Sequence, residues 1–283
     1  MKKILITGAK GYIGSYLFNQ LSAKFEIIAT SLHEDNDNNI ISLDIRNNSN
    51  VINFITKIKP NIIIHLGALS NVKLCEKNPL ETFETNVNGT INIVQAANII
   101  NAKVIFISSL ASINPISEYG KSKYMSEEII KTVTEGYEIL QLSMTFGLSP
   151  NTKNHRPFNK IIKTKISGIP NTYDNTWKFQ PTHLKHVFLV INRIIIEDTF
   201  LGRTIPVITK ECTTMYKLIT DILGNNNILK GNSYSNRKEH VFGLNKLLDS
   251  NLPMCCYKLM IRDLKEDIRV YQLMIANKSD DRK

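Results

Sequence analysis

Tyr119 and Lys123 have the side-chain types and the spacing for proton transfer. They stand four positions apart in the segment YGKSK, so in a helix they share one face. An ammonium group beside a phenol stabilises the phenolate and lowers the pKa of the tyrosine, which can then exchange a proton near neutral pH. Upstream, Ser109 follows the apolar run at 104–107 and offers a hydroxyl that can bind a carbonyl oxygen. The three residues together predict a site that acts on a carbonyl group.

The first fourteen residues, MKKILITGAKGYIG, place three glycines directly behind an apolar run. Gly8, Gly11 and Gly14 lead into a helix-compatible segment, which gives the order strand, glycine turn and helix. Glycine lets backbone amides approach a pyrophosphate closely, and the N-terminus of a helix adds a favourable dipole. The pattern predicts the dinucleotide-binding start of a βαβ unit.

The elements that must position these residues follow from apolar runs that alternate with helix-like segments. Continuous runs such as 62–65 and 104–107 are typical of parallel strands covered on both faces. The expected strands are Lys3–Thr7, Glu26–Thr30, Ile40–Leu43, Asn61–Leu66, Lys103–Ser108 and Glu138–Leu142, and the expected helices are Tyr12–Ala23, Ser49–Ile58, Leu80–Ile100 and Tyr119–Glu135. The sequence predicts an α/β fold with a Rossmann-type doubly wound parallel sheet, whose strand ends gather at one ligand-binding edge.

The pattern changes after Gly147, where a loop-like segment begins. We expect a dinucleotide-binding domain over residues 1–150 and a smaller C-terminal α/β substrate-binding region over 151–283, with some interleaving of the two. The second region is expected to hold helices at Pro157–Ser167, Leu184–Ile196, Thr213–Leu223 and Cys256–Met274, and a short strand at Thr204–Ile208.

The composition is that of an ordinary globular chain of 283 residues, 42% of them hydrophobic. Scattered basic residues produce the net charge of +10, so no nucleic-acid partner is expected. No apolar run approaches the roughly 20 residues that cross a bilayer, so we expect a cytoplasmic protein without a membrane partner. Cys75, Cys212, Cys255 and Cys256 lack metal-ligand spacing, and His183 and His186 lack a third ligand, so reduced thiols and no metal are expected.

In its motifs the chain resembles the extended short-chain dehydrogenases/reductases, the NAD-dependent epimerase/dehydratase superfamily. The motifs, which cover residues 1 to about 150, are TGAKGYIG at 7–14, LDIRN at 43–47, HLGAL at 65–69, NVNGTIN at 86–92, ISS at 107–109 and YGKSK at 119–123. Within that superfamily the segments 59–79, 142–152 and, more weakly, 177–183 are most similar to dTDP-4-dehydrorhamnose reductase-like sugar-nucleotide reductases. The resemblance implies an NAD(P)-dependent oxidoreductase that acts on a nucleotide sugar for surface polysaccharide biosynthesis.

The resemblance also implies roles for individual residues. For the cofactor these are Gly8, Gly11, Tyr12, Ile13 and Gly14 around the pyrophosphate, Asp44 and Ile45 beside the adenine, and Leu66, Gly67, Ala68 and Leu69 along one wall with Asn86 behind them. Ser109 and Tyr119 would bind the reacting oxygen, and Lys123 would hold the nicotinamide ribose while tuning Tyr119.

The cofactor preference depends on the end of the second strand, where NAD enzymes place a carboxylate for the ribose hydroxyls. This chain has Ser31 there and no carboxylate before Glu34. Ser31 does not repel a 2′-phosphate, and Lys10 or His33 could approach one. We therefore expect NADP(H) to be preferred, with NAD(H) also accepted.

Substrate contacts are expected from the second region. The candidates are His155, Arg156, Phe158, Asn159, Lys160, Trp177, Lys178 and Gln180. Arg156 or Lys160 could meet a diphosphate, and an aromatic ring could stack on a base or sugar. Phe158 and Trp177 also suit the core of the small region, and for each of them the core is the favoured interpretation.

The expected reaction is reduction of a 4-keto-deoxy sugar, with hydride delivered to C4 and Tyr119 as the proton donor. Ser109 is followed by Leu110 and Ala111 rather than by the acid that related dehydratases carry, so dehydration is not expected. A nucleotide-sugar C4 epimerase with tightly bound NAD is the nearest alternative. A non-catalytic, NADP-binding regulatory subunit is an alternative of another class.

Two departures from the family pattern bear on this reading. Ser109 and Tyr119 are only ten positions apart, where relatives commonly carry a longer loop, and Gln141 occupies a position where the family often has arginine. A homodimer through the segments 80–100 and 119–135, common in such enzymes, is also considered.

Overall fold

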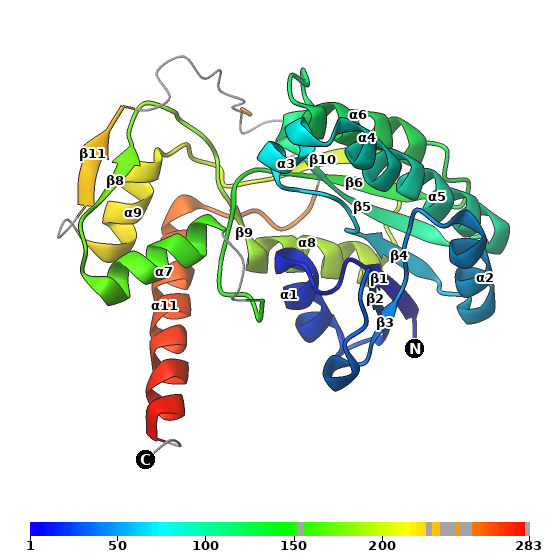
Figure 1. Ribbon diagram of the computed structural model, residues 1–283, viewed down its shortest axis with the longest axis horizontal. Coiled ribbons are helices and arrows are strands. Elements are labelled where there is room, and N and C mark those ends of the chain that lie inside the picture. The colour runs from blue at the N-terminus through cyan, green and yellow to red at the C-terminus, as the bar shows by residue number, and fades with distance from the viewer. Residues whose placement is uncertain (152–155, 225–227, 233–241, 244–250, 281–283) are drawn as a thin grey trace. The chain divides into compact units, whose positions relative to one another are not determined.

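The structure is a computed structural model of the chain and describes residues 1–151, 156–224, 228–232, 242–243 and 251–280 (Figure 1). The chain divides into two compact units, Met1–Leu142 with Ile191–Pro206, and Ser143–Val190 with Val207–Lys283. The segment 191–206 lies with the first unit, rather than with the residues around it in sequence, because its strand extends the sheet of that unit.

The described part of the first unit contains a seven-stranded sheet with the order β10-β6-β5-β4-β1-β2-β3. The strands are β1 (Lys3–Thr7), β2 (Glu26–Ser31), β3 (Ile40–Ser42), β4 (Ile62–His65), β5 (Lys103–Ser109), β6 (Tyr137–Leu142) and β10 (Arg203–Val207). In parallel register, Ile6 of β1 faces Ala29 of β2 on one side and Ile64 of β4 on the other. The strand order reverses between β1 and β4, where this kind of sheet binds its ligands. The predicted Rossmann-type sheet is confirmed.

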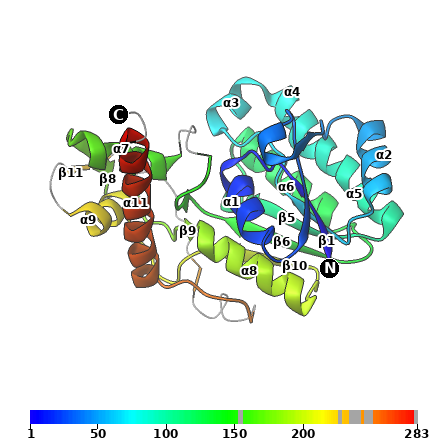
Figure 2. The same ribbon diagram turned by 90° about the horizontal axis from the view of Figure 1, so that it is seen from below.

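Helices cover both faces of this sheet, with α5 and α6 on one face and α1 on the other (Figure 1). They are α1 (Tyr12–Leu21), α2 (Asn48–Ile58), α3 (Val72–Lys77), α4 (Pro79–Thr82), α5 (Gly89–Ile100) and α6 (Glu118–Ile130), and the second half of α8 (Leu184–Glu197) also belongs to this unit. α2 lies beside α5 (Figure 2). Buried apolar residues from α2, α5 and α6, such as Ile55, Ile93 and Ile130, form one core with Ile63 and Val104 of the sheet.

The segment predicted as one helix over Leu80–Ile100 contains a π-helical turn, η2 (Phe83–Asn88), between α4 and α5. The short helix α3 before it was not predicted. Asn86 lies within the π-helical turn, and its side chain binds the backbone of Leu69 instead of facing solvent. Wide helical turns of this kind are frequently found at functional sites.

Strand β10 borders β6 and brings a salt bridge into the sheet edge. The fully buried carboxylate of Glu138 in β6 accepts hydrogen bonds from the backbone amide of Leu201 at 2.7 Å and from Nε of Arg203 at 3.1 Å. Burial raises the pKa of Glu138, and these two donors oppose that rise. The buried carboxylate is therefore satisfied only when residues 201–203 are in place.

The second unit contains two small parallel sheets, β7 (Thr145–Phe146) with β9 (Thr182–His183), and β8 (Asn171–Asp174) with β11 (Ile228–Gly231). Its helices are α7 (Pro157–Ser167), α9 (Met215–Leu223) and α11 (Tyr257–Asp280), together with the first half of α8, and α9 lies beside α11 (Figure 2). The core residues include Phe146, Phe158, Phe179, Leu218, Met260 and Leu264.

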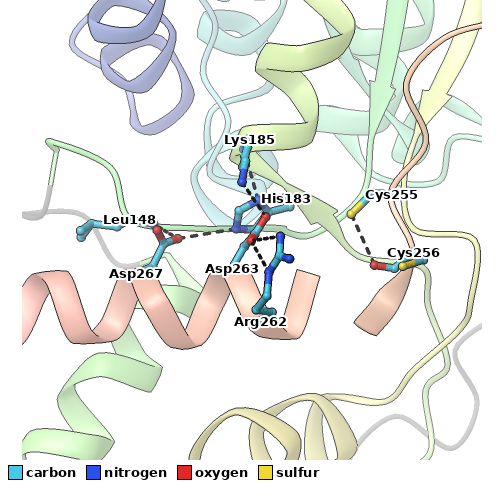
Figure 3. Close-up of polar contacts among 8 residues, drawn as sticks. All are labelled: Leu148, His183, Lys185, Cys255, Cys256, Arg262, Asp263 and Asp267. Atoms are coloured by element: carbon cyan, nitrogen blue, oxygen red, sulfur yellow. Dashed lines mark hydrogen bonds and ion pairs between the residues drawn. The ribbon is translucent and has the colours of Figure 1, made fainter. Parts of the chain in front are cut away.

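Polar contacts join α11 to the segment around β9 (Figure 3). Asp267 accepts a hydrogen bond from the backbone amide of Leu148 at 2.8 Å and lies 3.6 Å from Nε2 of His183. One turn earlier, Asp263 pairs with the Lys185 ammonium at 3.1 Å. Asp267 of α11 therefore packs against His183 and holds the backbone at Leu148.

Within the described residues, no helix has the length and apolar character that crossing a bilayer requires. In that same part of the chain, no three His, Cys, Asp or Glu side chains gather as metal ligands would.

Candidate active site

The turn between β1 and α1 has a backbone that only glycine accommodates. Gly8 has a φ of +72°, and a Cβ atom there would lie 2.9 Å from the amide nitrogen of Gly67. At Gly14 a Cβ atom would lie 2.2 Å from the carbonyl oxygen of Gly8. Gly11 is the exposed N-cap of α1 and has no side chain to occupy the helix N-terminus, and no acidic residue lies in the first helical turn. The turn, with Tyr12 and Ile13 opening the helix, fits the pyrophosphate of a dinucleotide.

The side chain of Thr7 joins the ends of the two strands at the switch point. Its hydroxyl oxygen accepts hydrogen bonds from the backbone amides of Leu66 at 3.2 Å and Gly67 at 3.1 Å. Leu66, Gly67 and Ala68 are all partly exposed along this stretch. Thr7 therefore holds the backbone that was expected to line the cofactor.

A fully buried histidine, His65, completes this junction. Its Nδ1 lies 2.7 Å from Oγ1 of Thr7, and its Nε2 lies 3.1 Å from Oγ1 of Thr90. Burial lowers the pKa of His65 to about 3, and the positive charge of Lys123 acts in the same direction. The imidazole is therefore neutral at ordinary pH and serves to connect β1, β4 and α5.

Asn86 connects the wall after β4 to the helix of the catalytic candidates. Its Oδ1 accepts the backbone amide of Leu69 at 2.7 Å, and its Nδ2 donates to the Leu69 carbonyl at 3.0 Å. Nδ2 also donates to Oγ of Ser122 in α6 at 2.9 Å. The buried side chain of Asn86 thus ties the backbone of Leu69 to α6.

The residues expected around the adenosine lie at the ends of β2 and β3. Ser31 is the last residue of β2 and is partly exposed. In the loop that follows, the ammonium of Lys10 donates to the carbonyl oxygen of Glu34 at 3.2 Å, and His33 is exposed. A cation therefore lies against the loop that follows Ser31.

Asp44 and Ile45 face different surroundings. The carboxylate of Asp44 pairs with the guanidinium of Arg46 at 2.7 Å, and this hydrogen-bonded pair lowers the pKa of Asp44. Ile45 is buried, and its side chain fills the space above Gly67 and Gly89, where added Cβ atoms would lie 3.2 Å and 2.7 Å from its Cδ1. The Ile45 side chain therefore packs beneath the expected cofactor wall as part of the core.

Ser109 is the last residue of β5, at the same edge of the sheet. Its Oγ accepts the backbone amide of Ala111 at 3.2 Å and caps a short 3-10 helix, η3 (Leu110–Ser112). Because the hydroxyl is the acceptor in that bond, its own proton remains to be donated to a ligand.

The helix that carries Tyr119 packs closely against the turn after Ser109. Ser117 caps α6 by accepting the backbone amide of Gly120 at 3.0 Å. A Cβ atom at Gly120 would lie 2.4 Å from the carbonyl oxygen of Ala111, so only glycine allows this approach. The 3-10 turn and the capped helix start together account for the ten-residue spacing between Ser109 and Tyr119.

Lys123 is only 4% exposed, although it carries an ammonium group. Its Nζ donates to the carbonyl oxygen of Ile107 at 3.0 Å and lies 4.6 Å from the ring centroid of Phe106. Burial lowers the pKa of Lys123 to about 8, and the charge of Glu127 opposes this shift. Tyr119 lies one helical turn earlier on the same face and is partly exposed. The arrangement places a buried cation behind a phenol that a ligand can reach.

The substrate candidates in the second unit separate into exposed and buried side chains. Arg156 and Lys160 are exposed at the start of α7, where Arg156 is the N-cap. Phe158 has no exposed surface and belongs to the core of the unit, and Asn159 is only 8% exposed. Of the two roles considered for Phe158, ligand stacking and core packing, its ring has the second. His155 lies outside the described residues.

Trp177 stacks on Phe179, with ring centroids 4.8 Å apart, and is partly exposed. Its backbone amide donates to the carboxylate of Asp174 at 2.8 Å. Lys178 is exposed, whereas Gln180 is buried and its amide binds backbone carbonyls such as that of Thr209. Trp177 therefore packs along the edge of the core, and the buried side chain of Gln180 holds backbone segments together.

Sequence reasoning did not identify Thr7, His65, Gly120 and Glu127 as residues that organise the site. Thr7, His65 and Gly120 lie inside quoted motifs, so their positions next to the strand end or between Tyr119 and Lys123 were the available signal. Glu127 reads as one of several charged residues on a helix, and nothing in the sequence marks it as buried.

Comparisons with known proteins assign the chain to a family. The model of the NAD dependent epimerase/dehydratase family matches residues 4–169. Among curated proteins, the dTDP-4-dehydrorhamnose reductase of Aggregatibacter actinomycetemcomitans is 30% identical over 163 residues, which cover 52% of this chain and 53% of that protein. The UDP-glucose 4-epimerase of Mycoplasma pneumoniae is 25% identical over 199 residues, 60% of this chain and 58% of that protein. The match thus spans somewhat over half the length of these relatives.

Among solved structures, the dTDP-4-dehydrorhamnose reductase of Bacillus anthracis in complex with NADP superposes with a TM-score of 0.80. The sequences are 22% identical, and the alignment covers 94% of this chain and 99% of that one. At this identity the likeness establishes a shared fold across both units.

Proposed function

Because the chain belongs to the NAD dependent epimerase/dehydratase family, we propose that it is an NAD(P)-dependent reductase of a nucleotide-activated 4-keto-deoxy sugar. The observation that carries the proposal is the placement of Ser109 and of the Tyr119–Lys123 pair at the ligand edge of the sheet. The position after Ser109 holds the buried apolar side chain of Leu110, so no carboxylate is available there for dehydration. The similarity to a dTDP-4-dehydrorhamnose reductase supports the same reaction class. The similarity to polysaccharide biosynthesis proteins of Bacillus subtilis and Staphylococcus aureus supports a role in surface polysaccharide biosynthesis.

In this reaction each residue has a defined task. The hydroxyls of Ser109 and Tyr119 hydrogen-bond the C4 carbonyl oxygen and orient the carbonyl. A bound reduced nicotinamide supplies hydride to C4. Tyr119 gives its proton to the oxygen, so the carbonyl becomes a hydroxyl, and the tyrosinate then takes a proton from solvent. The ammonium of Lys123 remains charged near neutral pH, because its pKa is about 8, and it stabilises the tyrosinate.

We further propose that NADP(H) is preferred and that NAD(H) is also accepted. Ser31 places an uncharged hydroxyl where a carboxylate would repel a 2′-phosphate. The ammonium of Lys10, held at the Glu34 carbonyl, supplies a positive charge beside the same loop.

A nucleotide-sugar C4 epimerase would use the same three residues and is the second candidate, favoured by the similarity to the Mycoplasma pneumoniae epimerase. Retained NAD distinguishes the two, because an epimerase must keep its cofactor through both half-reactions. A non-catalytic subunit of the same fold would not need a cation buried behind Tyr119, which speaks against that alternative.

The test is a cofactor analysis of the purified protein followed by turnover. Denatured protein is analysed by mass spectrometry for released nucleotide, and native protein is titrated with NADPH and NADH by fluorescence. We expect an empty protein that binds NADPH and oxidises it when a dTDP- or UDP-4-keto-deoxy sugar is added. Released NAD without any response to NADPH would favour the epimerase, and binding of neither nucleotide would contradict both. Sedimentation of the same sample checks for a homodimer formed through α5 and α6.

A further inference from the structure

The carboxylate of Glu127 lies at the centre of a buried hydrogen-bond network. Glu127 is 6% exposed and lies in α6, one helical turn after Lys123. Its Oε1 accepts hydrogen bonds from the hydroxyls of Ser108 and of Ser112, the latter at 2.6 Å. The Nε2 amide of Gln141 donates to both carboxylate oxygens at 3.1 Å and to the Ser112 hydroxyl at 3.0 Å.

The two serines bound by Glu127 lie on either side of Ser109. Ser108 precedes it in β5, and Ser112 ends the 3-10 turn that Ser109 caps. Oγ of Ser112 also lies 2.7 Å from the Ser109 carbonyl oxygen, so its single proton is shared between that oxygen and Glu127. One carboxylate on the helix of Tyr119 therefore holds both flanks of Ser109.

Gln141 gives the same network a contact to the neighbouring strand. It occupies the β6 position that faces Ser108 of β5. An amide there donates hydrogen bonds to the carboxylate oxygens of Glu127 without placing a second cation beside Lys123. A buried charge is costly unless its lone pairs are satisfied, and here hydroxyl and amide donors satisfy it.

We infer that Glu127 is a positioning residue for the proposed reduction: its carboxylate fixes Ser109 relative to Tyr119 and acts electrostatically on the ammonium of Lys123. The inference rests on the proposed function for its effect on turnover, but its effect on Lys123 is a property of the protein alone.

Three titratable side chains, those of His65, Cys75 and Glu127, lie near the ammonium of Lys123. His65 faces it from β4 and is neutral, because burial lowers its pKa to about 3. Cys75 faces it from α3, and burial raises the pKa of that thiol, so it too is neutral near pH 7. The carboxylate of Glu127, one helical turn further along α6, raises the pKa of Lys123 against the effect of burial.

Two substitutions distinguish the effect of the Glu127 charge from the effect of its side-chain length. Glu127→Gln keeps the side-chain length and removes the charge, whereas Glu127→Asp keeps the charge and shortens the side chain by one methylene. The matched control is Glu128→Gln, the same change at the next position, where the side chain is exposed and pairs with Lys131. All are compared with the wild type for kcat, KM, the pH dependence of kcat, and NADPH affinity.

The readout that does not depend on activity is the titration of Lys123 itself. In protein labelled with ¹³C at the lysine ε-carbon, the Lys123 signal is identified by its absence from Lys123→Met. We expect its titration midpoint to fall by roughly one pH unit or more in Glu127→Gln and to stay near the wild-type value in Glu127→Asp. We expect kcat to fall roughly tenfold or more in both variants, with KM little changed.

The outcomes distinguish failure of the positioning role of Glu127 from failure of the proposed reductase function. Glu127→Gln with the wild-type kcat, pH profile and Lys123 titration would overturn the positioning role, whatever the substrate is. If no 4-keto sugar is reduced by the wild type, the proposed function fails, and an unshifted Lys123 midpoint in Glu127→Gln would still overturn the inference. If Glu127→Gln does not fold, Ser112→Ala removes one of the contacts and keeps the charge. An unchanged kcat in that variant would count against the positioning role.

Discussion

Gly120 and Ala111 approach each other so closely that no side chain fits between them. A Cβ atom on Gly120 would lie 2.4 Å from the carbonyl oxygen of Ala111. The contact joins the helix of Tyr119 to the turn that Ser109 caps. The distance between Ser109 and Tyr119 therefore depends on the absence of a side chain at Gly120.

Gly120→Ala is therefore expected to push the first turn of α6 away from η3. Overpacking of this kind costs about 1–3 kcal/mol in the free energy of unfolding, and misplacing Tyr119 lowers kcat by roughly tenfold or more. Chemical denaturation and steady-state kinetics check both effects. Lys121→Ala, at the exposed neighbouring position, is the control and should change neither quantity appreciably. Wild-type turnover in Gly120→Ala would show that the close approach is not needed.

Tyr119→Phe tests the proton donor directly. Removal of the phenol hydroxyl should lower kcat by on the order of a hundredfold while NADPH affinity stays nearly unchanged. Tyr124→Phe is the matched control, because Tyr124 lies in the same helix and is largely exposed. Fluorescence titration and turnover are measured on both variants. Equal kcat in Tyr119→Phe and Tyr124→Phe would rule out proton transfer by Tyr119.

Lys123→Met is expected to raise the free energy of unfolding and to abolish activity. The size of the stability change depends on pH. Burial lowers the pKa of Lys123 from 10.5 in the unfolded chain to about 8 in the folded one. Below pH 8 the lysine is charged in both states, so the wild type carries the full burial penalty. Between pH 8 and 10.5 the folded state loses its proton first, and the penalty shrinks as pH rises.

The methionine variant should accordingly be more stable than the wild type at pH 7, by on the order of 1–3 kcal/mol. The difference should decrease toward pH 10.5, and the variant should be inactive. Urea unfolding at several pH values measures this trend, with Lys121→Met as the exposed control. A stability difference that grows with pH would contradict the buried, depressed pKa.

Ser31→Asp tests the cofactor preference. A carboxylate at the end of β2 should repel the 2′-phosphate and weaken NADPH binding by roughly tenfold or more, while it leaves NADH binding intact or improved. Lys10→Met should weaken NADPH binding alone, because it removes the cation beside the same loop. Paired titrations with the two nucleotides give the ratio of affinities. A ratio that neither substitution changes would mean that the 2′-phosphate lies elsewhere.

The strands of the first unit were predictable because they are buried on both faces and read as unbroken apolar runs. Lys3–Thr7 matches its prediction in full, and the other predicted runs differ from the strands by one or two residues at their ends. The glycine turn was equally legible, since the close contacts of Gly8 and Gly14 require that residue type. Local sequence determines such features, so local reasoning finds them.

Features that depend on distant partners were not predictable. The π-helical turn at Phe83–Asn88 forms around the contact of Asn86 with Leu69, which the helical pattern does not reveal. Glu127 looks like an ordinary surface glutamate until Ser108 and Gln141 surround it. Phe158 suited either a ligand or a core, with the core favoured, and only the packing around it decides.

The salt bridge at the sheet edge has a consequence for protein synthesis. Glu138 leaves the ribosome well before Arg203 and Leu201, its partners in the finished sheet. Until β10 is made, β6 is an open edge with an unsatisfied carboxylate, and open edges invite pairing with other chains. A fragment that stops near residue 150 would retain this exposed edge permanently. The glycine turn and all three catalytic candidates would be present in such a fragment, yet it would be prone to aggregate during expression.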